Sequence, residues 1–325
     1  MVLGPDKFKG VFALVPACAT PDAHKWEAVD TFDKDSFSIL ADKLIRDGVH
    51  GVMTTGSMGE GHTLLWEEQK RLFETVVDVV NGRVPVITGT WAPNTREAIM
   101  KSRYAADIGA DGVLSGPPHY EKLSVDNVVQ YYKDLSEACP DIAIVIYHNP
   151  SVFRVTIPVE RYVQIMEEIP NAVAVKETLS DPFRVRAEAE LCKGKIGFMA
   201  MENNLMEAMK CGFTGCWSVY VNMNPKPTLR LYEACVKKEW KTAREITAAF
   251  NAIWAKVNSI LEQNGLYFFS YEENIMHIMV NESGYAKTGP ARRPFAIVPE
   301  AVEKAARLIA QEYKEIVKKF LGEDK

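Results

Sequence analysis

Short apolar or β-branched runs alternate with amphipathic stretches along most of the chain. Apolar residues that recur every three to four positions predict helices, and the short runs between them predict buried strands. The predicted strands are Gly10–Cys18, Gly51–Ser57, Val84–Trp91, Gly112–Pro118, Ala143–Asn149, Ala172–Thr178, Ile196–Met201 and Gly215–Val221. The predicted helices are Asp35–Asp47, Trp66–Val80, Thr95–Ile108, Val125–Ala138, Val159–Glu168, Asp181–Leu191, Asn204–Cys211 and Lys226–Lys238. Eight β/α units in succession indicate an α/β protein with a parallel sheet, and the number matches a closed (β/α)8 TIM barrel.

The alternative fold is a doubly wound open sheet, which also alternates strands and helices. Such sheets usually carry a glycine-rich phosphate loop after their first strand. Here the first strand is followed by Ala19-Thr20-Pro21-Asp22-Ala23, which cannot serve as that loop. The pattern therefore favours the barrel.

The end of the chain predicts three further helices, Trp240–Glu262, Phe268–Val280 and Pro299–Phe320. A Gly289-Pro290 pair interrupts the pattern between the last two. Neither a linker nor a low-complexity stretch separates these helices from the barrel. We therefore expect a single domain over residues 1–325, with the barrel at about 8–240 and a C-terminal helical extension at about 240–323.

Composition restricts the class of protein and its partners. Hydrophobic residues are 47% and charged residues 25% of the chain, as a well-cored globular protein requires. The net charge of −5 provides no cationic field, which argues against a nucleic-acid partner. The six cysteines form no CxxC pair, so we expect them to be reduced and buried. The N-terminus lacks an apolar signal core, and no apolar run reaches the roughly 18 residues of a membrane span, so we expect a cytoplasmic protein.

The strand Ala172–Thr178 carries a lysine, Lys176, close to its carboxyl end. Alternation places Lys176 on the same face as Ala172 and Ala174, which leave space around it, and places the valines on the other face. Burial disfavours a charged lysine and only the free amine attacks a carbonyl, so this position suits imine chemistry. Catalytic groups of barrels lie at the C-terminal ends of strands, where Lys176 falls. The residues alone leave open a lysine that extends to solvent or pairs with a carboxylate.

The preceding strand ends in Tyr147-His148-Asn149-Pro150. Tyr147 and Asn149 share a face, which matches the face of Lys176 if both point into the barrel. A phenol near a cation can move protons, which makes Tyr147 a candidate acid/base. The alternatives are a tyrosine that caps the core with its hydroxyl in water, and an Asn149-Pro150 pair that only ends the strand.

A turn of closely spaced glycines, Gly56-Ser57-Met58-Gly59, follows the second strand. Its backbone N–H groups can converge, and the start of the next helix adds positive potential, so the turn can bind a carboxylate. It fits neither a dinucleotide fingerprint nor a P-loop, because the Gly-Lys-Ser/Thr ending is missing. Glycine turns after strands are common, so this turn alone does not establish a site.

Three motifs, Gly-Ser-Met-Gly-Glu at 56–60, Tyr-His-Asn-Pro at 147–150 and Val-Lys-Glu-Thr at 175–178, occur in order. Together they resemble the dihydrodipicolinate synthase / N-acetylneuraminate lyase superfamily of Schiff-base barrels, over about residues 8–240. The resemblance implies Lys176 as the imine lysine and Tyr147 as the proton shuttle. It also implies that Ser57 and Met58, with Gly56 in the same turn, bind the pyruvyl carboxylate, and that the protein is a homotetramer.

Further segments are similar to the hydratase-aldolases that cleave trans-o-hydroxybenzylidenepyruvate or 2′-carboxybenzalpyruvate. This narrower resemblance implies an aryl-ring wall at Trp217, with Trp91 as a looser candidate, and an active-site asparagine at Asn274. A tryptophan at a strand end is otherwise more often a core residue. The expected partners are a 2-oxo acid and an aromatic aldehyde. The segments that carry this narrower resemblance are Ala19–Thr31, Thr63–Glu68, Asn94–Glu97, Cys216–Ser218 and Gly289–Glu300.

Several alternatives remain at this point. Dihydrodipicolinate synthases place an arginine shortly after the Tyr-Asn-x-Pro segment, where this chain has Val152 and the nearest arginine is Arg154, which argues against that activity. A superfamily aldolase or dehydratase for a sugar acid, and a non-catalytic barrel that senses 2-oxo acids, stay open.

His119 and His148 belong to no His-Glu-x-x-His pattern or comparable cluster, so we predict neither a metal nor another cofactor.

Overall fold

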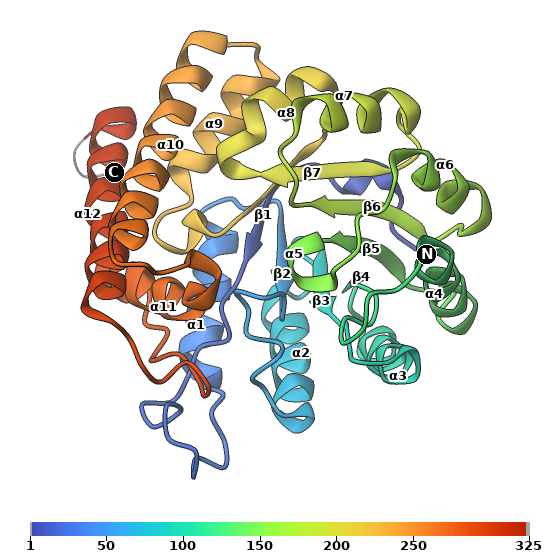
Figure 1. Cartoon of the computed structure of the whole chain (residues 1–325), viewed down its shortest axis with the longest axis horizontal. Helices are drawn as coiled ribbons and strands as arrows, with labels where there is room; N and C mark the ends of the chain where they lie inside the picture. Colours follow the sequence, from blue (N-terminus) through green and yellow to red (C-terminus); the bar gives the residue numbers. More distant parts are fainter. Residues whose placement is uncertain (1, 323–325) are drawn as a thin grey trace. The chain divides into compact units, whose positions relative to one another are not determined.

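The computed structural model describes residues 2–322, in which eight parallel strands form a closed barrel in sequence order (Figure 1). The (β/α)8 barrel is therefore confirmed, and the open sheet was the wrong alternative. The strands are β1 (Gly10–Leu14), β2 (Gly51–Thr54), β3 (Val86–Gly89), β4 (Gly112–Ser115), β5 (Ala143–His148), β6 (Ala172–Glu177), β7 (Gly197–Met201) and β8 (Gly215–Ser218).

The helix that the periodicity predicts between each strand and the next, and the one after the last strand, is present, with ends that differ by at most two residues. Side chains at several N-caps fix the starts, because Asp33, Asn94, Ser124 and Asp181 each accept a hydrogen bond from a first-turn N–H group. The helices are α1 (Lys34–Arg46), α2 (Trp66–Val80), α3 (Thr95–Asp107), α4 (Val125–Ala138), α6 (Val159–Glu168), α7 (Pro182–Leu191), α8 (Leu205–Cys211) and α9 (Lys226–Val236).

The predicted strand ends are less accurate than the helix ends. The first predicted strand continues to Cys18, whereas β1 ends at Leu14, and the second continues to Ser57, whereas β2 ends at Thr54. Val15 and Cys18 are nevertheless buried. An apolar run indicates which residues are buried, and the buried segment continues beyond the last hydrogen bonds between neighbouring strands.

The chain forms two compact units, each described here by itself. Of the described residues, the first unit contains 2–12, 50–53 and 82–217, and the second contains 13–49, 54–81 and 218–322. The single-domain organisation stays a prediction. Residues 1 and 323–325, among them the last residue of the predicted extension, lie outside the described part.

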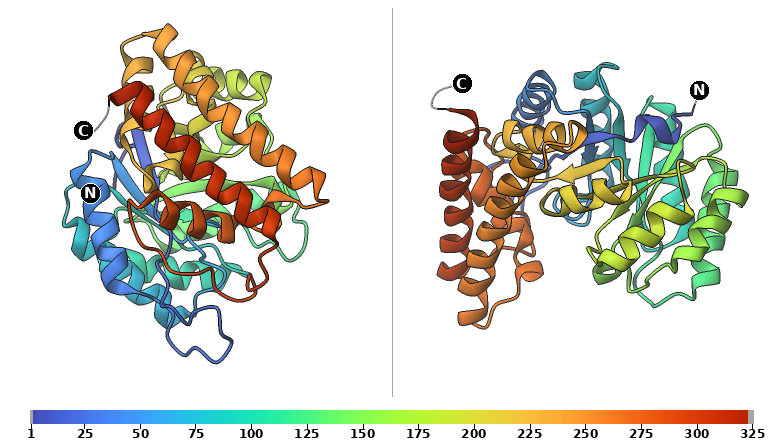
Figure 2. Two further views of the ribbon diagram at one scale, coloured as in Figure 1. Left: turned by 90° about the vertical axis from the view of Figure 1, so that its left-hand side faces the viewer. Right: turned by 90° about the horizontal axis from the view of Figure 1, so that it is seen from above.

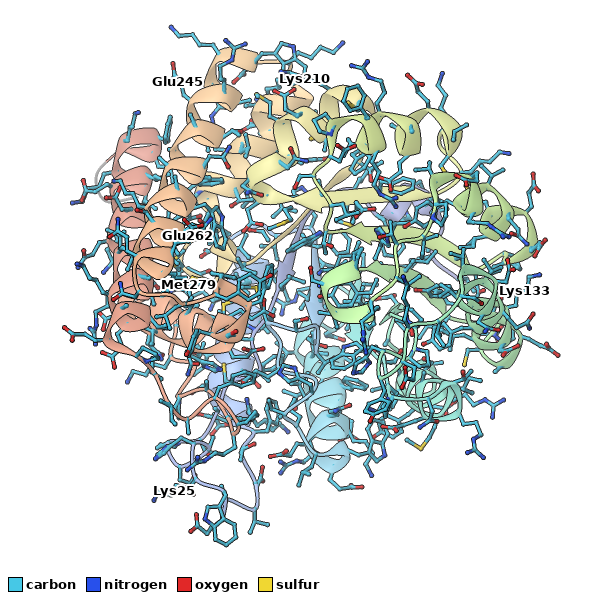
Figure 3. All side chains as sticks on the ribbon, viewed as in Figure 1. Lys25, Lys133, Lys210, Glu245, Glu262 and Met279 are labelled. Carbon is cyan, nitrogen blue, oxygen red and sulfur yellow. The ribbon has the colours of Figure 1, made fainter. Side chains whose placement is uncertain are left out.

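The first unit contains most of the barrel strands and the helices α3, α4, α6, α7 and α8, which lie along the outside of β3–β7 (Figure 1). Consecutive helices of this layer contact one another. Figure 3 shows Lys133 on the outer side of α4, where its ammonium pairs with Glu168 of α6. Such exposed pairs contribute little to stability.

The second unit contains α1, α2, α9 and the C-terminal helices α10 (Trp240–Gln263), α11 (Glu272–Ser283) and α12 (Glu300–Leu321). Helices α10 and α12 lie side by side, and α11 packs on α12 (Figure 2). The rings of Tyr220, Phe250 and Tyr313 pack together in this helical layer.

The predicted helix Phe268–Val280 is wrong in its first four residues. A 3-10 turn, Phe268–Ser270, comes first, and α11 begins at Glu272 after Tyr271, whose backbone is not helical.

Within residues 2–322, none of the helices is both long and apolar enough to span a bilayer. The six cysteines are free thiols, five of them buried, but Cys211 is partly exposed, contrary to expectation.

Candidate active site

Lys176 lies near the end of β6, enclosed between two aromatic rings. Its Nζ atom is 3.9 Å from the centre of the Tyr147 ring and 3.9 Å from the centre of the Trp217 ring. The strand register places Tyr147 of β5 directly opposite Lys176, so the predicted common face is confirmed. Lys176 is only 2% exposed, so the alternative of a lysine that extends to solvent is wrong.

The two ring faces favour a positive charge at the end of the Lys176 side chain. The face of an aromatic ring carries negative potential and attracts a cation within about 6 Å. Burial acts in the opposite direction, because it removes the water that solvates an ammonium ion. This position therefore lacks bulk water, yet it can stabilise any cation formed at this nitrogen.

Tyr147 is held by groups that follow it in the chain. Asn149 Nδ2 donates to Tyr147 Oη over 3.4 Å. Asn149 precedes a short helix, α5 (Pro150–Phe153), which the sequence pattern did not predict. The Phe153 ring packs edge-on against the Tyr147 ring, with 5.1 Å between the centroids. The phenol is 3% exposed, so it does not cap the core with its hydroxyl in water.

Aromatic side chains flank the lysine and the phenol. Trp217 Nε1 donates to the backbone oxygen of Glu177 over 3.1 Å, which fixes the indole beside Lys176. On the Tyr147 side, Phe153 contacts Trp91 and His119, with centroid separations of 6.4 Å and 6.1 Å. Ring surface therefore lies on both sides of the amine and continues beyond the phenol through Phe153.

A buried polar network lies on the outer face of the same two strands. His148 Nδ1 is 2.8 Å from both carboxylate oxygens of Glu177, and Arg184 Nε is 3.3 Å from Glu177 Oε2. Arg184 Nη2 is 2.8 Å from Glu188 Oε1. The sequence pattern missed this network. The sequence did contain a signal for this network. One outward position of each strand is polar, His148 in β5 and Glu177 in β6, whereas the other outward residues are isoleucine or valine.

Charge balance in this network indicates that Glu188 holds a proton. Arg184 is the cation of the network, while Glu177 and Glu188 are two carboxyl groups with fully buried side chains. Burial and the neighbouring Glu177 charge raise the pKa of Glu188 to about 9, from an ordinary 4.5. Burial also raises the pKa of Glu177, but the contacts with His148 and Arg184 outweigh this and lower it.

The Glu188 proton makes the stability of the fold depend on pH. The folded chain retains this proton up to about pH 9, whereas the unfolded chain releases it near pH 4.5. The contribution of Glu188 to the free energy of unfolding should therefore fall as pH rises between these values, by up to about 1.4 kcal/mol per pH unit. Urea denaturation of the wild type and Glu188→Gln at several pH values measures this. The slope should be smaller in the variant, and identical slopes would contradict the protonated Glu188.

The glycine turn after β2 belongs to the second unit. The Glu60 N–H bonds to the Ser57 oxygen and the Gly61 N–H to the Gly56 oxygen, so the segment folds back on itself. A Cβ at Gly59 would lie 2.6 Å from the Thr55 nitrogen, which explains the glycine.

The prediction that the start of the next helix adds positive potential to the Gly56–Gly59 turn is wrong. Helix α2 begins only at Trp66, after a further series of turns. Ser57 and Met58 are both partly exposed. Any anion binding by this turn therefore rests on its own backbone N–H groups and the Ser57 hydroxyl.

Glu60, which ends this turn, is bound in a buried cluster of the second unit. Arg292 Nη1 is 2.6 Å and His277 Nε2 is 2.8 Å from Glu60 Oε2. Arg292 also donates to the backbone oxygens of Ala17 and Cys18 in the segment that follows β1. Burial raises the pKa of Glu60, but His277 and Arg292 outweigh this and lower it to about 2. The cluster joins three segments that are far apart in the sequence.

Asn274, the predicted active-site asparagine, lies in the first turn of α11 in the second unit. It is 3% exposed, and its Nδ2 donates to the Phe295 oxygen over 2.8 Å. Within residues 2–322 its Oδ1 atom, although buried, has no hydrogen-bond partner. Over the same residues no group of three or more His, Cys, Asp and Glu side chains is arranged to hold a metal ion.

Comparison with known proteins identifies a family that this chain matches. The model of the dihydrodipicolinate synthetase family matches residues 11–311. A trans-O-hydroxybenzylidenepyruvate hydratase-aldolase of Sphingobium xenophagum is 31% identical, over 99% of this chain and 98% of its own. A trans-2′-carboxybenzalpyruvate hydratase-aldolase of Nocardioides sp. (strain KP7) is 28% identical, over 96% and 95%. The solved structure of PhdJ bound to substrate intermediate is 28% identical, with a TM-score of 0.90 over 98% of this chain and 99% of that chain.

Proposed function

Since the chain belongs to the dihydrodipicolinate synthetase family and is a lyase, we propose that it is a class I hydratase-aldolase. In this proposal it cleaves a substituted benzylidenepyruvate to an aromatic aldehyde and pyruvate, through a Schiff base on Lys176. The similarity to hydratase-aldolases over nearly the whole chain supports the reaction class.

The observation that carries the proposal is the position of Lys176 between the Tyr147 and Trp217 rings. When the amine condenses with the C2 carbonyl of a 2-oxo acid, water leaves and an iminium ion forms at the same nitrogen. The iminium is a cation, so the two ring faces stabilise it as they stabilise an ammonium. It withdraws electrons from the reacting carbons, and this chemistry requires no metal.

Tyr147, assisted by Asn149, moves the protons of the reaction. The iminium makes C4 of the conjugated alkene electrophilic, so water adds its oxygen at C4 and a proton at C3. The C3–C4 bond then breaks, its electron pair moves toward the iminium, and the C4 hydroxyl loses its proton as the aldehyde leaves. Protonation of the enamine at C3 and hydrolysis of the iminium release pyruvate and regenerate Lys176. The phenol is opposite the lysine and hydrogen-bonded to Asn149, as such transfers need.

The aromatic side chains favour an aryl aldehyde over a sugar-derived acceptor. Trp217 covers the amine, Phe153 packs on the phenol ring, and Trp91 and His119 extend the ring surface beyond Phe153. Flat apolar surface gains free energy when it covers a ring, whereas a polyhydroxylated chain there would lose hydrogen bonds to water.

The other site residues stay predictions from the family resemblance. We propose that the amides of Ser57 and Met58, in the turn with Gly56, and the Ser57 hydroxyl bind the pyruvyl carboxylate. Asn274 is proposed as a substrate-binding residue because its buried Oδ1 atom has no partner among residues 2–322. The homotetramer and the cytoplasmic location also stay predictions.

The position of Arg154 also argues against a dihydrodipicolinate synthase-like activity. Its guanidinium donates to the Tyr120 backbone oxygen over 2.7 Å, at the exposed end of α5. Val152 occupies the position where those enzymes have an arginine for the carboxylate of the aldehyde partner.

A substrate panel tests the proposal. The purified protein is incubated with pyruvate and benzaldehydes that carry 2-hydroxy, 2-carboxy or no substituent, and the ultraviolet absorption of the conjugated product is followed. The matched comparison replaces the benzaldehyde with a polyhydroxylated aldehyde and measures pyruvate consumption. We expect product with at least one benzaldehyde. Turnover with the polyhydroxylated aldehyde alone would indicate a sugar-acid aldolase, and binding of pyruvate without turnover would indicate a sensor.

A further inference from the structure

Two pairs of residues occupy adjacent rungs of the β5–β6 ladder. Tyr147 lies opposite Lys176, and in the next rung His148 lies opposite Glu177. Because successive side chains of a strand point to opposite faces, the first pair faces into the barrel and the second faces out. The inner pair holds the proposed reacting groups, and the outer pair is fully buried behind it.

Every polar group of the His148 side chain has a partner. Nε2 accepts a hydrogen bond from the Ile157 N–H over 3.1 Å, so Nε2 carries no proton. Nδ1 therefore carries the proton of the neutral ring and donates to the Glu177 carboxylate, 2.8 Å away. The backbone oxygen of His148 accepts from Thr178 N and Oγ1, over 3.2 Å and 2.9 Å. These bonds fix the ring orientation, its tautomer and the ends of both strands.

The outer pair also fixes the groups that touch the inner pair. The Ile157 bond anchors the segment that follows α5, and Phe153 at the end of α5 packs on the Tyr147 ring. Glu177 accepts the Trp217 indole N–H at its backbone oxygen, and Trp217 forms the second wall around Lys176. A displacement of either strand end would therefore move the phenol or the indole relative to the amine.

We infer that His148 and Glu177 are positioning residues. From the outer face of the barrel, they keep the Tyr147 phenol and the Lys176 amine aligned for reaction. The inference rests on the proposed function, because it takes Lys176 and Tyr147 as the reacting groups. Strand register is fixed by such cross-strand pairs, since a slip by one residue moves every side chain to the other face. A buried carboxylate that loses its donor is unfavourable, so the pair also resists separation of the two strands.

Two substitutions of His148 test this role. His148→Leu removes both the donor and the acceptor, whereas the amide of His148→Gln can replace both. In His148→Leu we expect kcat to fall on the order of 10²-fold, because a displacement of about 1 Å at the reacting groups has that effect. The KM for pyruvate should change little, and His148→Gln should recover most of the loss in kcat. Glu177→Leu removes the acceptor and tests the same pair if His148→Leu does not fold.

His50 provides the matched control. Its Nδ1 accepts the Val11 N–H over 3.2 Å at the amino ends of the strands, so His50→Leu also removes a histidine–backbone bond in the same unit. We expect His50→Leu to lower the thermal midpoint and leave kcat unchanged.

Borohydride labelling of the wild type with pyruvate separates the two proposals. Absence of labelling at Lys176 would reject the proposed function. With labelling present, the positioning role is overturned by either of two results. One is a folded His148→Leu or Glu177→Leu with wild-type kcat, and the other is a loss of kcat no larger than that of His50→Leu.

Discussion

Lys176→Ala is expected to abolish turnover, with a loss of kcat on the order of 10⁴-fold or more, as for removal of other covalent nucleophiles. Without the amine, neither the imine nor the iminium that withdraws electrons from C4 can form. The measurement is the release of pyruvate from a benzylidenepyruvate. Borohydride treatment with pyruvate, followed by mass spectrometry, should show an adduct on the Lys176 peptide of the wild type and none in the variant.

Lys133→Ala is the control for the labelling experiment. Lys133 lies on the outer side of α4 (Figure 3), where it pairs with Glu168, so its removal should leave both activity and labelling unchanged. A Lys176→Ala protein that retains turnover, or a borohydride adduct on a different lysine, would reject the assignment of Lys176.

Tyr147→Phe is expected to lower kcat by about 10²- to 10⁴-fold, the usual effect of losing a general acid/base. The substitution keeps the ring, so the packing on Phe153 and the aromatic face 3.9 Å from Lys176 are retained. The iminium should therefore still form and be trapped by borohydride, although more slowly. The measurements are steady-state kcat and the rate of trapping with pyruvate.

Tyr131→Phe is the matched control for this change. Tyr131 is a buried tyrosine of the same unit, and its hydroxyl bonds to Ser115 Oγ over 2.5 Å. Its loss should reduce the free energy of unfolding by about 1 kcal/mol and leave kcat near the wild-type value. If Tyr147→Phe lowered kcat no more than Tyr131→Phe, the phenol would not be the proton shuttle.

The sequence alone determined the order of the eight strands and of the helices between them, and it favoured the closed barrel and a common face for Lys176 and Tyr147. The helix periodicity placed α2 at Trp66–Val80 and α4 at Val125–Ala138 without error. These features depend on which face of each element is apolar, and that information is local to each element.

Only the tertiary structure decided which residues meet across the barrel and across the helical layer. His148 and Glu177 are separated by 29 residues, Trp217 and Glu177 by 40, and Arg292 and Glu60 by 232. The pattern also extended β1 to Cys18, because burial continues beyond the ladder. Periodicity specifies a buried face, but the partner on that face depends on strand register and loop path, which arise only when the chain closes on itself.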